Sequence, residues 1–97
     1  MKINMNAKTR AWIMKRGGAV TIDPFHPLHG VVQSKSVDTI LSHETPEEES
    51  FYNKVVVNDV LVYVHKGLEE KKDVKMHITG YGPFEHLHVS GLRRKKK

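Results

Sequence analysis

The chain has 97 residues and no cysteine, with 38% hydrophobic residues and a formal net charge of +5 from 16 basic and 11 acidic side chains. This length predicts one small domain, and the lack of cysteine excludes disulfides, thiolate metal sites, cysteine nucleophiles and cysteine-ligated iron–sulfur clusters. No apolar run approaches the roughly 18 residues of a membrane span and no secretory leader is recognised, so we expect a cytoplasmic protein without membrane contact.

The first predicted element is an N-terminal helix. Asn4 or Asn6 can cap its first turn, because a short polar side chain accepts from free amide groups there. Its apolar stripe recurs at helical spacing, at Met5, Thr9, Trp12 and Ile13. Gly17-Gly18 predicts where the helix ends, with one glycine in the left-handed conformation.

The next segments predict short extended elements and turns. Residues 19–22 are predicted to form a strand that ends at Asp23-Pro24. Residues 25–30 are predicted to form a loop, because they contain proline and glycine, and residues 31–41 are predicted to be extended chain. Thr45 can then cap a short helix that starts at Pro46, because Glu48 completes a capping box. We expect that helix to end near Tyr52.

The strongest β signal lies in the second half of the chain. Residues 55–64 contain two β-branched runs around Asn58-Asp59, which predicts a tight hairpin. The further expectations are a polar connector over 69–73, an alternating strand over 74–79, a break at 80–83 and a last strand over 84–89.

Together these elements predict an α+β fold, in which the N-terminal helix packs on a small, mainly antiparallel β-sheet. One domain spans residues 1–92, and the basic residues 93–97 form a disordered tail. Exposed strand edges allow a monomer or a weak dimer.

Several segments also carry a family resemblance; they are residues 1–3, the helix with Gly17-Gly18, and residues 19–22, 60–68, 74–78 and 84–91. In this order they resemble the HesB-like family of A-type iron–sulfur carriers, and most closely a small uncharacterised branch known for a cysteine–cysteine or cysteine–selenocysteine motif. The resemblance implies a HesB-like fold. Such carriers are understood to bind their cluster or metal through cysteines, so a cysteine-based carrier function does not transfer. His26-Pro27-Leu28-His29-Gly30 stands where the related branch would have its cysteine pair.

Seven histidines suggest a metal site instead. His26 and His29 are three residues apart in the predicted loop, so two imidazoles can converge on one ion. His86 and His88 share one strand face, and His77 is expected on the outward face of a neighbouring strand. These residues predict histidine-mediated binding of a transition metal, with Zn, Ni, Cu or Fe as candidates, and Asp23 or His43 could complete the set. The alternative is that the histidines are ordinary half-exposed residues and that the prolines stiffen the loop.

The charge distribution suggests a second function. Residues 1–36 hold six basic side chains against one acidic, whereas residues 37–91 hold five basic and ten acidic ones. An anionic partner, either a nucleic acid or an acidic protein, would bind a basic set composed of Lys8, Arg10, Lys15, Arg16, Arg93 and Arg94. The alternative is a solvated helix face with a solubilising tail.

Two further features bear on function. Bases could stack on three aromatic residues, Tyr63, Tyr81 and Phe84, but Tyr63 and Phe84 are expected in the core. No nucleophile elbow, glycine-rich phosphate loop or catalytic carboxylate pair is present, so we expect a binding protein and not an enzyme.

Overall fold

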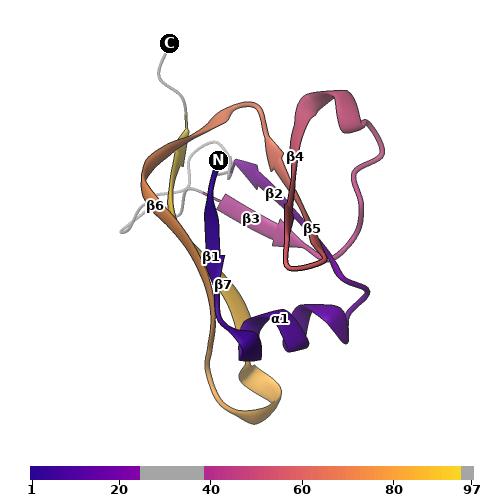
Figure 1. Ribbon diagram of the computed structural model, residues 1–97, viewed down its shortest axis with the longest axis vertical. Helices are drawn as coiled ribbons and strands as arrows, with labels where there is room; N and C mark the ends of the chain where they lie inside the picture. Colours follow the sequence, from indigo (N-terminus) through magenta and orange to yellow (C-terminus); the bar gives the residue numbers. More distant parts are fainter. Residues whose placement is uncertain (25–38, 95–97) are drawn as a thin grey trace, which may run out of the picture.

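The computed structural model describes residues 1–24 and 39–94, which form two β-sheets and one short helix (Figure 1). The elements in chain order are β1 (Ile3–Met5), α1 (Ala7–Met14), β2 (Ala19–Pro24), β3 (Thr39–Ser42), η1 (Glu49–Phe51), β4 (Tyr52–Val57), β5 (Val60–His65), β6 (Leu68–Thr79), η2 (Gly82–Phe84) and β7 (His86–Arg94). Within the described ranges, no helix has the length and apolar content needed to cross a bilayer.

Each sheet contains one parallel pair formed between distant parts of the chain. The three-stranded sheet has the order β1-β6-β7, with β1 parallel to β6 in the register Ile3↔Val74. The four-stranded sheet has the order β3-β2-β5-β4, with β2 parallel to β5. The other neighbouring strands are antiparallel.

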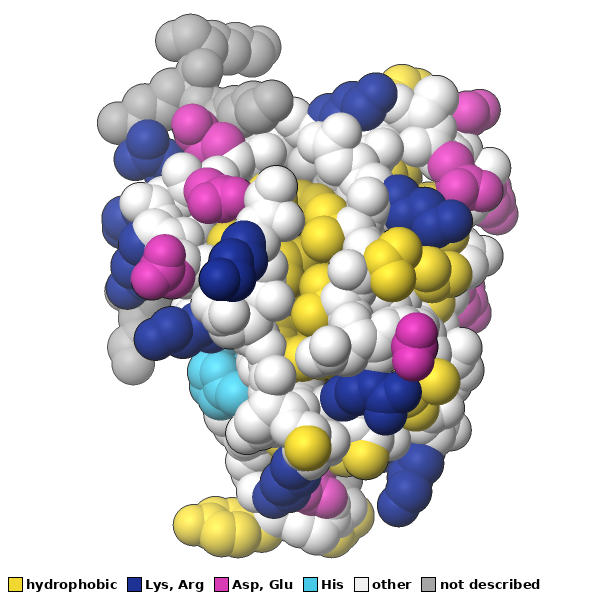
Figure 2. All heavy atoms as spheres, viewed as in Figure 1, with side chains coloured by type: hydrophobic (Ala, Val, Ile, Leu, Met, Phe, Trp, Pro, Cys, Tyr) yellow, Lys and Arg dark blue, Asp and Glu magenta, His cyan; other side chains and the backbone are white. Residues whose placement is uncertain are grey.

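The core lies between the two sheets and is closed at one end by α1 (Figure 1). Val20, Val62 and Val74 are fully buried, as is Ile13 of the helix. Figure 2 shows hydrophobic side chains at the surface between β1 and the β4–β5 hairpin, where the two sheets do not join. On the other side of the four-stranded sheet, the paired residues Thr21 and Tyr63 are each 4% exposed. Thr21 Oγ1 donates there to the carbonyl oxygen of Glu44, in the connection from β3 to β4, at 2.5 Å.

The expected α+β fold, a helix packed on one sheet, is wrong. The described residues are mostly β-structure in two sheets, and α1 has only eight residues. A helix of two turns buries only Thr9 and Ile13, so it cannot cover the apolar side of a sheet. The second sheet provides that cover, as two-layer packing requires.

The N-terminal helix itself is confirmed, with closer bounds. The Asn6 side chain accepts from the Thr9 amide at 2.8 Å, so Asn6 is the cap. Gly17 and Gly18 both have positive φ, and the Gly18 amide donates to the Ile13 carbonyl at 3.1 Å. Met5, expected in the helix, lies in β1 instead.

The predicted hairpin is also confirmed. Val57 pairs with Val60, and the turn residues Asn58 and Asp59 have φ values of 47° and 71°. Such positive φ values match the twist of a two-residue hairpin turn.

Three expectations for residues 45–94 are corrected. No capped helix starts at Thr45; a single 3-10 turn spans Glu49–Phe51, and no side chain caps it. Residues 69–73 belong to β6, which is 12 residues long. The last strand starts at His86 and runs to Arg94, so the first two residues of the expected basic tail lie in β7.

The aromatic residues divide between core and surface. Tyr63 is 4% exposed, as expected for a core residue. Phe84 is 78% exposed and Tyr81 is 89% exposed, because both lie in the connection between β6 and β7. The expectation that Phe84 is a core residue is therefore wrong.

Candidate functional site

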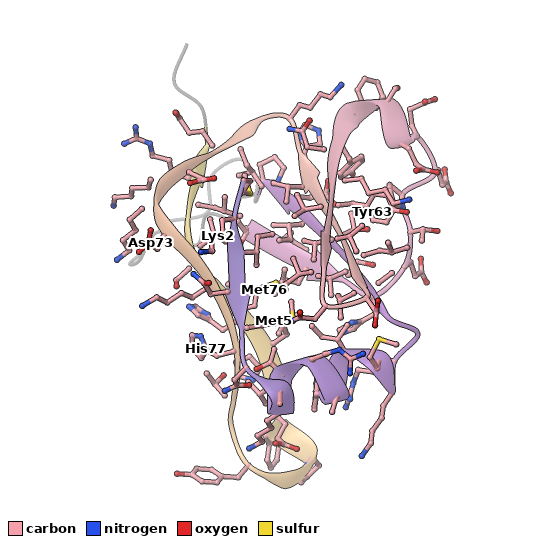
Figure 3. All side chains as sticks on the ribbon, viewed as in Figure 1. Lys2, Met5, Tyr63, Asp73, Met76 and His77 are labelled. Carbon is pink, nitrogen blue, oxygen red and sulfur yellow. The ribbon has the colours of Figure 1, made fainter. Side chains whose placement is uncertain are left out.

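The outer side of the three-stranded sheet carries histidines on two paired strands. The register of β6 and β7 places His77 opposite His88 and Thr79 opposite His86. Since side chains alternate across a strand, these residues point away from the core, into which Met76 points. Figure 3 shows His77 on the side of β6 that faces away from the four-stranded sheet.

His77 and His88 form a close cross-strand pair, the histidine pair. Their ring centroids are 5.0 Å apart and the rings are tilted by 58°. An imidazole nitrogen binds zinc at about 2.0–2.1 Å, so two rings that share one ion have centroids about 5 Å apart. His77 is half-buried and His88 is exposed. The spacing of the histidine pair is therefore compatible with two ligands to one metal ion.

His86 has a different role. Its Nδ1 lies 3.1 Å from the Phe84 carbonyl oxygen and its Nε2 lies 2.8 Å from Thr79 Oγ1. A carbonyl oxygen only accepts, so Nδ1 donates, and in the neutral ring Nε2 accepts from the hydroxyl of Thr79. Both nitrogens hold the β6–β7 connection closed, and neither can bind a metal while these bonds last.

The described part of the chain holds no group of three or more side chains arranged to bind a metal ion. The histidine pair supplies two imidazoles. His26 and His29, the other two residues of the predicted ligand set, lie outside the described residues.

A second polar cluster lies at the end of the four-stranded sheet. Tyr52 pairs with His65 across β4 and β5, and its hydroxyl donates to Asp23 Oδ1 at 2.5 Å. The rings of Tyr52 and His65 meet edge to face at 5.2 Å. The bond to Asp23, with burial and the negative charge, raises the pKa of Tyr52 from 10.0 to about 12. Tyr52 therefore stays protonated at neutral pH and acts as a donor, not as a base.

Sequence reasoning missed this cluster, although one signal was available. In a two-residue hairpin centred on Asn58-Asp59, counting outward from the turn pairs residue 57 with 60 and therefore Tyr52 with His65. The third member, Asp23, was not predictable in this way, because β2 joins β5 through a parallel pairing between distant segments.

His43, predicted as an additional metal ligand, lies beside the helix. Its ring centroid is 5.3 Å from that of Trp12, and the Arg16 guanidinium carbon lies 3.5 Å from the centre of the Trp12 ring. Burial first, and then the positive charge of Arg16, lower the pKa of His43 below 6.5. Trp12 also packs against the core, so these contacts have a structural role.

Most of the described residues in the predicted anion-binding set have partners within the protein. Lys8 lies 3.9 Å from Glu85, and Arg10 donates to the Asn58 carbonyl at 2.6 Å and lies 3.3 Å from Asp59. Arg93 lies 3.6 Å from Glu69.

Two other residues of the predicted anion-binding set, Arg16 and Lys15, are not in the ion pairs of the described residues. Arg16 packs on Trp12, and Lys15 is exposed. Arg94 is the last residue of β7. The set therefore does not form one continuous cationic surface of free side chains in the described residues.

Comparison with known proteins identifies one family. The profile of the CC/Se motif containing family matches residues 1–92. No curated protein and no solved structure matches the chain. The wider resemblance to HesB-like carriers is not supported by these comparisons, and the α+β fold expected from it is not the fold observed.

Proposed function

We propose that this chain, which belongs to the CC/Se motif containing family and has no cysteine, binds a transition-metal ion through the imidazoles of His77 and His88. Imidazole suits zinc, copper and nickel. The observation that carries the proposal is the 5.0 Å separation of the two rings across β6 and β7.

The scaffold supports this role by fixing both backbones. Next to the histidine pair along the strands are Met76, which is 2% exposed, and Val89, which is 8% exposed. These buried side chains anchor β6 and β7 from the core side. Ligands carried by strands with such support are held more rigidly than ligands on loops.

Two imidazoles leave open positions on any of these metals. Water, or a group from another molecule, would complete the coordination, so the bound ion would be exchangeable. Among the divalent candidates, copper should bind most tightly and zinc less so, following the general order of stability for nitrogen ligands.

The test is calorimetric titration of the untagged protein with Cu²⁺, Ni²⁺ and Zn²⁺. His77→Ala and His88→Ala should each remove most of the binding. His86→Gln is the matched control, because it deletes an imidazole from the same side of the sheet but outside the pair, and it should leave the affinity unchanged. Since protons compete with the metal for imidazole nitrogens, affinity should fall between about pH 7.5 and about pH 5.5.

The opposite pattern would overturn the proposal. Binding that survives in the double variant of His77 and His88 would exclude the pair as ligands. If the double change His26→Ala with His29→Ala then abolished binding, the ligands would lie in that segment instead.

A further inference from the structure

A cavity of about 470 Å³ lies between β3 and β7, which are edge strands of the two sheets. Ligand pockets have volumes of about 300–1,000 Å³, so this cavity is large enough for a small molecule. It extends along β7 from Leu87 to Leu92 and is bounded on the other side by Thr39 and Leu41. Among the described strands β3 and β7 do not pair, so the two sheets leave a gap between these edges.

The apolar part of the lining comes from the core. Leu87, Val89 and Leu92 are 7%, 8% and 6% exposed, whereas Val20 and Val62 at the centre of the core are 0% exposed. These three side chains present a narrow apolar edge of the core to the cavity, against which an alkyl chain could lie.

The polar part of the lining is cationic. Lys71 and Lys72 border the cavity and are exposed, and no carboxylate of the described residues lines it. An irregularity in the pairing of β6 with β7 places them there, because the register shifts between Glu70 and Lys75 opposite Gly91. Within the described residues, the ion pairs of the protein involve other basic side chains.

We propose that this cavity binds an amphipathic monocarboxylate of the fatty-acid type, with its alkyl chain against the apolar wall and its carboxylate at Lys71 and Lys72. The apolar wall selects for the chain and the lysines select for the anion. The inference is independent of the metal site, although His88 also lines the cavity, so the binding assay is carried out with a chelator present.

The first test is titration of the full-length protein, by calorimetry and by amide NMR shifts, with hexanoate, heptanoate and octanoate below their micelle concentrations. Each added methylene that is buried should raise the affinity about fourfold. Octanol has the same chain without the charge and should bind more weakly than octanoate. Amide shifts should follow β3 and the 87–92 segment. The proposal is overturned if octanoate does not bind saturably, or if affinity is independent of chain length.

The second test changes the charge. Lys71→Glu with Lys72→Glu should lower octanoate affinity about tenfold or more and leave octanol binding unchanged. Lys54→Glu with Lys66→Glu is the control, because both lysines are exposed, lie outside the lining and give the same change in net charge. An equal loss in the control would show general electrostatic attraction and would overturn the assignment.

The third test blocks the cavity. Thr39→Trp places a large ring at the β3 side of the opening and should abolish binding of octanoate and octanol alike. Retained binding in this variant would refute the location. Vesicles of anionic phospholipid provide the last comparison, because binding to vesicles without binding to free octanoate would indicate a membrane surface as the ligand and would also overturn the proposal.

Discussion

Gly91 and Gly17 allow a direct measurement of how closely β6 packs on β7. Both have φ near +100°, at +93° and +108°, a conformation that L-residues rarely adopt. They differ in their surroundings. A Cβ added at Gly91 would overlap the carbonyl oxygen of Asp73 and lie 2.9 Å from that of Lys72, whereas a Cβ at Gly17 meets nothing within 4 Å.

The expected costs follow from this difference. Gly17→Ala introduces only the backbone strain of a positive φ, about 1–2 kcal/mol. Gly91→Ala adds overpacking against backbone atoms that cannot rotate away, about 1–3 kcal/mol more. The free energy of unfolding should therefore fall by about 2–5 kcal/mol in Gly91→Ala, a large part of the roughly 5–15 kcal/mol typical of a domain.

Urea denaturation of the parent and both variants measures these costs, and thermal denaturation gives the corresponding shift in melting temperature. In a chain of this size 1 kcal/mol corresponds to about 4–8 °C, so Gly91→Ala should melt at least about 4 °C below Gly17→Ala. Equal losses in the two variants would refute the reasoning, because they would mean that the irregular part of β6 does not pack against Gly91. The rim of the proposed cavity would then have a different shape.

Three further predictions concern single side chains. Tyr52→Phe should lower the free energy of unfolding by about 1 kcal/mol near neutral pH, after allowance for partial exposure. Because the pKa of Tyr52 in the folded protein is raised from 10.0 to about 12, the stabilisation by its hydroxyl is present below pH 10.0 and should disappear as the pH rises towards 12. Denaturation of both proteins at several pH values tests this dependence. The pKa of His43 lies below 6.5, so the stabilisation by neutral His43 is present above pH 6.5 and is lost on acidification. Arg16→Met should raise the pKa of His43, and an unchanged NMR titration of the His43 ring would contradict the effect assigned to the charge of Arg16. Ile13→Ala should cost about 2–5 kcal/mol in thermal or urea unfolding, because the side chain is fully buried, and a loss below 1 kcal/mol would mean that α1 does not contribute to the core.

Local interactions made several elements predictable from the sequence alone. Asn6 and Gly17-Gly18 bound the helix because a cap and a positive-φ glycine act within a few residues of their own position. The hairpin around Asn58-Asp59 was also predictable, because turn preferences act within a few residues. Alternation over residues 74–79 likewise placed His77 on the outer side of its strand.

Contacts between distant segments decided the rest. The parallel pairings of β1 with β6 and of β2 with β5 depend on which arrangement buries the most apolar surface, and no short pattern specifies a partner strand. The chemistry of the candidate sites depends on these contacts. Alternation alone assigned a side of the sheet to each histidine, but only the register between β6 and β7 brought His77 opposite His88, and only the failure of β3 to pair with β7 left a cavity beside Lys71 and Lys72. Capping and turn preferences act along a few consecutive residues, whereas register and sheet closure are set by burial over the whole chain.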